Sequence, residues 1–215
     1  MDGALDGARG VPFAATLMDA AGHGLSWVLD EIAYGVLLVS PGGKVLHANQ
    51  AARHELARRQ LLTVHEGHVQ TSDAVQSRMV LQALAKAETG RRSLIGLRSP
   101  ARKRCNIAVV PLGADRPHAC IALIFSRACV CDAVMLCFFA RTHGLTPTEE
   151  QVLAILCQGF SAPETARQLK VAVSTVRSHV RSMCAKTQSN GVRALVGQVA
   201  VLPPIGAAHL HVPLH

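Results

Sequence analysis

The stretch VAVSTVRSHVRSMCAK, residues 171–186, combines apolar, small and basic side chains at helical spacing. At about 100° per residue, one apolar arc predicted to pack on a core contains Val173, Val176, Val180, Met183 and Cys184. The opposite face and its flanks hold only small, polar or basic side chains: Ser174, Thr175, Arg177, Ser178, His179, Arg181, Ser182, Ala185 and Lys186. An outer face without any acid suits a helix that lies against a polyanion. The alternative is an ordinary amphipathic helix whose outer face is basic by chance.

These side chains differ in the contacts that they would make with double-stranded DNA. Arg177 and Arg181 are candidates for a guanine edge or a phosphate, because a guanidinium donates two parallel hydrogen bonds. Thr175, His179 and Lys186 are candidates for positioning on phosphates. The small serines between them, Ser174 and Ser178 foremost, would let the helix backbone approach the groove.

The charge of the whole chain agrees with an anionic partner. The 215 residues contain 22 Lys and Arg against 14 Asp and Glu, a net charge of +8. The last acid is Glu164, and six bases follow it. Such a segment indicates nucleic acid first and a membrane surface second. Aromatic residues make up only 3% of the chain, which argues against modules that stack single-stranded bases.

Strong helix-start signals precede the basic stretch. TPTE (146–149) and SAPE (161–164) are both Ser/Thr-x-x-Glu capping boxes with a proline in the first turn. Two short helices and then the basic helix, separated by a tight turn, predict a helix-turn-helix. A last helix is expected over 190–201, with an apolar face made of Val192, Leu195, Val196 and Val199.

This region resembles the DNA-binding domain of LuxR-type (GerE-like) transcription factors. The resemblance rests on LTPTEEQVLAILCQGFSAPETARQLKVAVSTVRSHVRSMCAK and implies an all-α four-helix domain over 145–202, whose third helix enters the major groove. The fourth helix commonly forms a dimer contact in that family, so a homodimer is expected. Three positions depart from the family pattern: Lys170 replaces the usual turn glycine, Ala172 the usual serine cap, and Thr187 the usual leucine.

The first half of the chain shows strand and helix patterns in alternation. Residues 1–20 are interpreted as a flexible arm, and 21–127 as an antiparallel α+β domain with its helices on one side of the sheet. The expected strands are 35–40, 44–48, 93–98, 105–112 and 119–126, and the expected helices are 49–60 and 72–90.

The segment GVLLVSPGGKVLHANQAA resembles the opening hairpin and first helix of PAS domains. The resemblance implies a PAS-like sensor domain with a pocket for a small-molecule ligand or cofactor, or a face for dimerisation. Which cofactor, if any, is left open: the blue-light flavin motif does not occur. His54, His65 and His68 lie in no recognisable haem-ligand setting and are interpreted as surface or capping histidines.

Two segments flank the predicted DNA-binding domain. Residues 128–144 are expected to form a connecting helix, either an ordinary packing helix or a parallel dimer contact with a stripe of Val130, Val134, Cys137 and Phe138. Residues 203–215 are interpreted as a tail.

Several other functions fit the sequence less well. An enzyme or metal sensor would rest on Cys129-x-Cys131, a spacing weaker than Cys-x-x-Cys, with Cys105, Cys120 or a histidine. A sigma-factor-like tail would need an aromatic-rich upstream region, which the sequence lacks. Catalysis would need a nucleophile triad or a phosphate loop, and the sequence shows no pattern of either kind.

The start of the chain lacks a signal-peptide pattern, and no apolar run reaches the ~20 residues of a membrane span. The sequence therefore predicts a cytoplasmic, non-enzymatic transcription regulator without metal or membrane partner. RNA polymerase is a further candidate partner.

Overall fold

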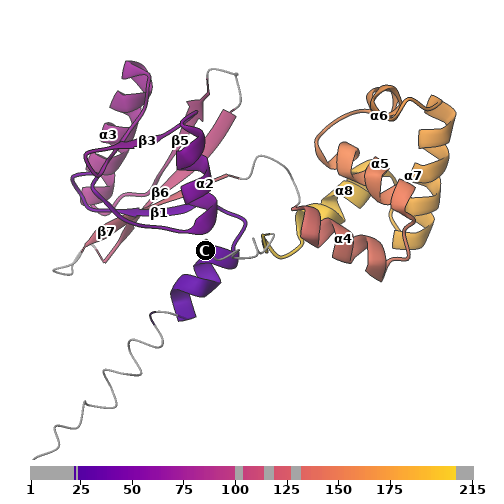
Figure 1. The fold of residues 1–215 in the computed structure, drawn as a ribbon, viewed down its shortest axis with the longest axis horizontal. Helices are drawn as coiled ribbons and strands as arrows, with labels where there is room; N and C mark the ends of the chain where they lie inside the picture. The colour runs from indigo at the N-terminus through magenta and orange to yellow at the C-terminus, as the bar shows by residue number, and fades with distance from the viewer. Residues whose placement is uncertain (1–21, 23, 100–103, 114–118, 127–131, 207–215) are drawn as a thin grey trace, which may run out of the picture.

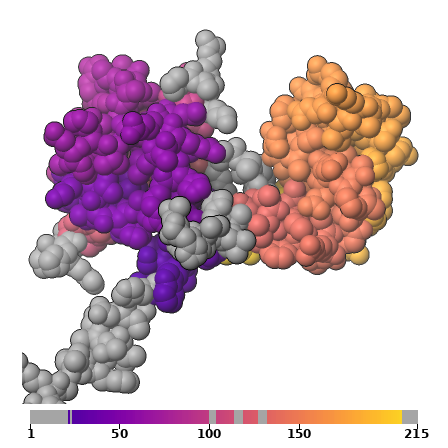
Figure 2. Space-filling view, in the orientation of Figure 1, coloured from indigo at the N-terminus to yellow at the C-terminus, as the bar shows by residue number. Residues whose placement is uncertain are grey.

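The computed structural model describes residues 22, 24–99, 104–113, 119–126 and 132–206 of the chain (Figure 1). Its buried apolar residues form two separate clusters, one within residues 37–125 and the other within residues 136–199. The two clusters belong to two lobes, which Figure 2 shows side by side. The fold-class prediction is confirmed, because an antiparallel sheet domain precedes an all-helical one.

The first lobe is built on a five-stranded antiparallel sheet in the order β2-β1-β7-β6-β5. The strands are β1 Val36–Val39, β2 Val45–Ala48, β5 Ser93–Arg98, β6 Arg104–Leu112 and β7 Cys120–Phe125. Burial alternates along β6, where Cys105, Ile107 and Val109 point into the core and their neighbours do not. A strand with this period of two has one face on a core and one face away from it.

Two helices cover the inner face of this sheet, as expected. Helix α2 spans Gln50–Arg58 and helix α3 spans Ala74–Glu88. Asp73 caps α3 by accepting a hydrogen bond from the Gln76 amide at 2.8 Å. Val80, Leu84 and Ala87 of α3 are buried at i, i+4 and i+7 spacing, so one stripe of the helix packs on the strands.

The opening hairpin has the PAS-like form that the sequence predicts. Gly43 takes φ +81° in the turn between β1 and β2, a conformation that glycine adopts without strain. Asn49 then caps α2, accepting from the Ala52 amide at 3.0 Å and from the Val36 amide at 2.7 Å. Its side chain is completely buried, so this one residue joins the start of β1 to the start of α2.

A second, two-stranded hairpin was not anticipated from the sequence. Strands β3 Thr63–His65 and β4 His68–Gln70 pair with each other and lie outside the five-stranded sheet. Glu66 and Gly67 both have positive φ in the connecting turn. A two-residue turn of this kind is typical of tight hairpins, so the Glu-Gly pair was the available signal.

The second lobe consists of helices α4 Ala133–Thr142, α5 Pro147–Cys157, α6 Ala162–Leu169, α7 Val173–Thr187 and α8 Val192–Ala200. Both predicted capping boxes are present, with the Thr146 side chain and the Ser161 side chain each paired to a glutamate at the third helical position. In α8, Leu195 and Val199 are buried as predicted, but Val192 is 37% exposed because it lies at the first residue of the helix.

Helix α4 has one face in the core of the second lobe. Leu136 and Phe139 are buried in the same cluster as α5, α7 and α8, whereas Phe138 is 52% exposed. Val130, part of the proposed dimer stripe, lies outside the described residues, as do residues 1–20 and 207–215 of the predicted arm and tail. Packing in the lobe accounts for the buried face of α4. The dimer contact and the domain limits stay predictions.

Candidate functional site

Helix α7 is held in the second lobe by its apolar arc. Val176 and Met183 are fully buried, and Val173, Val180 and Cys184 pack against the same cluster. The Thr187 side chain at the end of the helix is also buried, and its hydroxyl donates to the Met183 carbonyl at 2.8 Å. The predicted core side of this helix is therefore confirmed, and the orientation of α7 about its axis is set.

This orientation turns the small and basic face outward. Ser174, Thr175, Arg177, Ser178 and Arg181 are exposed, and His179 and Ser182 are partly exposed. Within the part of the chain that the structure describes, neither arginine forms an ion pair. Among the described residues, the one hydrogen bond of their side chains is a long one of 3.5 Å, donated by Arg181 Nη2 to Ser178 Oγ. Both guanidinium groups are consequently available for an anionic partner.

Lys186 lies in a different setting from the two arginines. Its ammonium donates to Glu149 Oε2 at 2.7 Å, and the Glu149 side chain is only 4% exposed. Glu149 is the capping-box glutamate of α5, which also accepts from the Thr146 amide at 2.7 Å. Lys186 therefore ties the C-terminal turn of α7 to the N-terminal turn of α5. The contact of Lys186 with DNA phosphate stays a prediction.

The surroundings of Glu149 keep its carboxylate ionised. Burial of the group raises its pKa, but the ammonium of Lys186, the Thr146 amide and the Ser182 hydroxyl together outweigh burial and lower the pKa to about 2. A charged carboxylate is thus available at every pH near neutrality. The pair joins two helices by a charge-assisted hydrogen bond whose carboxylate is shielded from water.

The turn before α7 contains two of the three departures from the LuxR-type pattern. Lys170 ends α6 in the left-handed conformation, with φ +55° and ψ +42°. Ala172 precedes α7 and provides no side-chain cap. A residue with a Cβ thus occupies the left-handed position, and α7 begins without a side-chain cap. The turn nevertheless closes, because the Lys170 amide donates to the carbonyls of Ala166 and Arg167.

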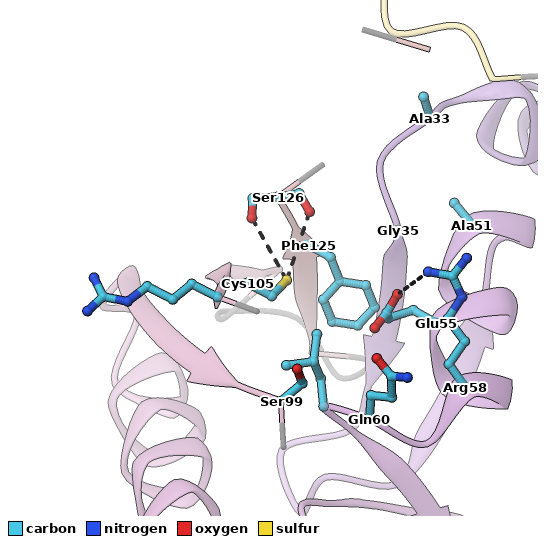
Figure 3. A pocket seen from close by; sticks show the side chains of 12 residues that line it. Ala33, Gly35, Ala51, Glu55, Arg58, Gln60, Ser99, Cys105, Phe125 and Ser126 are labelled. Carbon is cyan, nitrogen blue, oxygen red and sulfur yellow. Dashed lines mark hydrogen bonds and ion pairs between the residues drawn. The ribbon is translucent and has the colours of Figure 1, made fainter. Parts of the chain in front are cut away.

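The first lobe contains a cavity of about 350 Å³ between α2 and one end of the sheet. Figure 3 shows the Phe125 ring turned toward its centre, with polar side chains around the rim. The lining combines apolar and polar groups, among them Gly35, Glu55, Gln60, Ser99, Phe125 and Ser126. A hollow of this size, with an aromatic ring and several converging polar groups, is large enough for a small molecule. The sequence analysis did not identify these residues, because they converge only through the tertiary fold.

Cys105 lies in the wall of this cavity and is buried. Burial raises the pKa of its thiol, although hydrogen bonding to Ser126 opposes the effect. The protonated thiol is the poorly nucleophilic form, so Cys105 has the character of a small buried hydrophobe with a weak donor.

Among the described residues, no group of three or more His, Cys, Asp or Glu side chains is arranged to hold a metal ion. His54 lies on α2, whereas His65 and His68 face each other across the β3–β4 hairpin. Cys129 and Cys131 lie outside the described residues. None of the described helices is long and apolar enough to cross a membrane.

Solved structures similar to this chain share little sequence with it. The phage VqmA–DPO complex is 17% identical, with 86% of this chain and 93% of that chain covered and a TM-score of 0.38. A Vibrio cholerae VqmA–ligand–DNA complex is 16% identical, with 85% and 90% covered and a TM-score of 0.36. The PAS domain of nitrogen regulation protein NR(II) from Vibrio parahaemolyticus is 14% identical, with 48% and 96% covered and a TM-score of 0.33.

At these TM-scores the superpositions do not bear on the function of the chain, and no curated protein matches it in sequence. The C-terminal lobe, in contrast, has a direct sequence match. Residues 143–196 match the profile of the family described as bacterial regulatory proteins, luxR family. The match covers α5, α6 and α7 and the start of α8, with the acid-free face of α7 outward. Residues 143–196 are therefore a helix-turn-helix DNA-binding domain of the LuxR family.

Proposed function

We propose that the protein is a cytoplasmic, homodimeric transcription regulator that reads the major groove of DNA with α7. The observation that carries this proposal is the outward face of α7, on which Arg177 and Arg181 stand exposed beside small serines. Phosphates attract the two positive charges, and the low serine ridge allows the backbone to approach base edges. Thr175 and His179 are assigned to phosphate positioning on the flank.

The PAS-like domain is proposed to control this activity by binding a small molecule. The cavity of about 350 Å³ supports the assignment, because its Phe125 ring offers an apolar contact and Glu55, Gln60 and Ser99 offer polar ones. A ligand of matching character would have a compact apolar or aromatic body and a few hydrogen-bonding groups. RNA polymerase is the proposed protein partner through which DNA binding would affect transcription, and no catalytic step is assigned.

The DNA-binding role is tested by removing both exposed arginines of α7. The double variant Arg177→Ala, Arg181→Ala is expected to lose at least about tenfold in affinity for a specific duplex and to reduce the salt dependence, because charge-assisted contacts at the groove disappear. Fluorescence-anisotropy titrations at several salt concentrations, with specific and random duplexes, would measure both quantities.

The matched control is Arg91→Ala, Arg92→Ala, which removes the same charge from exposed residues of the first lobe. This control should bind DNA within about twofold of the unmodified chain, since its lost charges lie outside the proposed interface. If the α7 double variant remains folded and binds as tightly as the control variant, the assignment of α7 to the groove is wrong.

A further inference from the structure

The chain beyond α8 returns to the first lobe. Residues 203–206 run beside residues 31–33 (Figure 1), where Ile205 and Ile32 form an antiparallel bridge. The Ala33 amide donates to the Pro204 carbonyl at 2.7 Å, and the Gly206 amide donates to the Glu31 carbonyl at 2.7 Å. Leu202, directly before this segment, packs on the core of the DNA-binding domain. Residues 203–206 therefore connect the two lobes by main-chain hydrogen bonds.

The segment that receives these bonds is itself fixed to the PAS-like domain. The buried Asn49 side chain donates to the Leu29 carbonyl and to the Tyr34 carbonyl, both at 2.8 Å. The Asp30 carboxylate accepts from the Gln50 amide at 2.6 Å. Movement of residues 29–34 would break these hydrogen bonds. The segment is therefore held in place on the PAS-like domain, where residues 203–206 pair with it.

The same segment continues into the wall of the cavity. Ala33 and Gly35 line the cavity, and Ala33 also donates to the Pro204 carbonyl. Gly35 lies so close to the Phe125 ring that a Cβ atom there would collide with it. Ala33 thus bonds to residues 203–206 and also lines the cavity. Gly35, two residues later, lines the same cavity and lies against the Phe125 ring.

We propose that residues 203–206 form an intramolecular strap that holds the DNA-binding domain to the cavity wall of the PAS-like domain. Its regulatory meaning rests on the proposed function, which takes the cavity as the ligand site and α7 as the DNA-binding helix. The two main-chain hydrogen bonds that make up the Ile32–Ile205 bridge are few beside the ladder that joins β6 to β7, so the strap is able to open without unfolding of either lobe.

Gly206 offers a matched pair of variants in the full-length chain. Gly206→Pro removes the amide that donates to the Glu31 carbonyl and places the proline ring against that oxygen. Gly206→Ala keeps the amide, and its added Cβ would lie 3.6 Å from the Glu31 carbonyl oxygen and the Ala33 Cα, an ordinary contact distance. The first variant opens the strap and the second preserves it.

Amide hydrogen exchange resolved by residue provides the test. In Gly206→Pro, the Ala33 amide is expected to exchange roughly tenfold faster than in Gly206→Ala, because its acceptor on Pro204 is no longer held in place. The Val36 amide, bonded to Asn49 Oδ1, should exchange equally in both variants and reports that the PAS-like domain stays folded. Small-angle scattering should show a larger radius of gyration only for the proline variant.

The proposal is overturned if Ala33 exchanges at the same rate in both variants. It is also overturned if the protection of Ala33 in the unmodified chain disappears on dilution, because the strap would then belong to a second copy. None of these measurements involves DNA or a ligand. A failure of the proposed function would appear in the binding titrations and leave the strap result unchanged.

Discussion

Two residues of the helix-turn-helix turn, Lys170 and Ala172, lower the stability of the domain, one through backbone strain and the other through a missing helix cap. Lys170 adopts a left-handed conformation that costs a residue with a Cβ about 1 kcal/mol or more. Ala172 precedes α7 without a side-chain cap, and a missing cap costs about 1 kcal/mol. The buried Thr187 has its hydroxyl satisfied by the Met183 carbonyl and adds no such cost. The stability deficit of the domain therefore lies in the turn.

Lys170→Gly is expected to raise the free energy of unfolding by about 0.5–1 kcal/mol, the relief of the left-handed strain less the extra entropy of the unfolded glycine. Urea unfolding without DNA would measure the change. Arg167→Gly, inside the right-handed helix α6, is the control and should lower the stability by about 1 kcal/mol. Equal destabilisation by both glycines would show that the left-handed turn is not strained.

Among the elements, α5 and α7 are joined by the pair between Glu149 and Lys186. The hydrogen bond of 2.7 Å between them is shielded from water on the Glu149 side, and it connects the first turn of one helix with the last turn of the other. Because α7 carries the proposed DNA-binding face, this pair positions the face relative to the rest of the domain. Lys186 thereby supports DNA binding by holding α7 in its position against α5.

Lys186→Met should lower the free energy of unfolding at pH 7 by about 1–3 kcal/mol, since it leaves a buried carboxylate without its ammonium. The folded-state pKa of Glu149, about 2, lies below its ordinary value of 4.5. The pair therefore stabilises the protein fully above about pH 4.5, and this contribution is lost as the pH falls toward 2.

Thermal unfolding of both chains between pH 7 and pH 3 measures the effect. The difference between the unmodified chain and Lys186→Met should shrink as the pH falls. Glu149→Gln is the companion variant, and it should show a weaker acid dependence than the unmodified chain in the same range. A difference that stays constant from pH 7 to pH 3 contradicts the assigned role of the pair.

For the whole molecule, the two hydrophobic clusters share no residue. The second cluster draws on residues from Met135 to Leu202 and includes one face of α4, so the folding unit of the DNA-binding domain begins before the family match at 143. Among the residues that the structure describes, the hydrogen bonds between the lobes are those of residues 203–206 with residues 31–33. Each lobe thus has its own core.

A fragment of residues 132–202 is expected to fold by itself and to unfold in one cooperative transition, because it contains a complete core. Circular dichroism during heating would show this. A fragment starting at residue 143 should be less stable by several kcal/mol, since it lacks Leu136 and Phe139. Equal stability of the two fragments would mean that α4 is not part of the folding unit.

Local signals in the sequence determined most of the helices, strands and caps. Thr146, Ser161 and Asn49 were predictable as caps because a cap depends on residues within one turn of the chain. The buried side of α7 and the outward direction of Arg177 and Arg181 followed from helical periodicity alone. The β3–β4 hairpin escaped prediction because three-residue strands are too short to show a period.

The tertiary structure decided the contacts between residues far apart in the chain. Nothing local to Lys186 indicates that its ammonium reaches Glu149, 37 residues earlier. Phe125 and Glu55 line one cavity only because α2 packs on β1, which pairs with β7. Residues 203–206 resemble a tail until they pair with residues 31–33. Periodicity reports which side of an element is buried, whereas the partner on that side depends on how the elements pack.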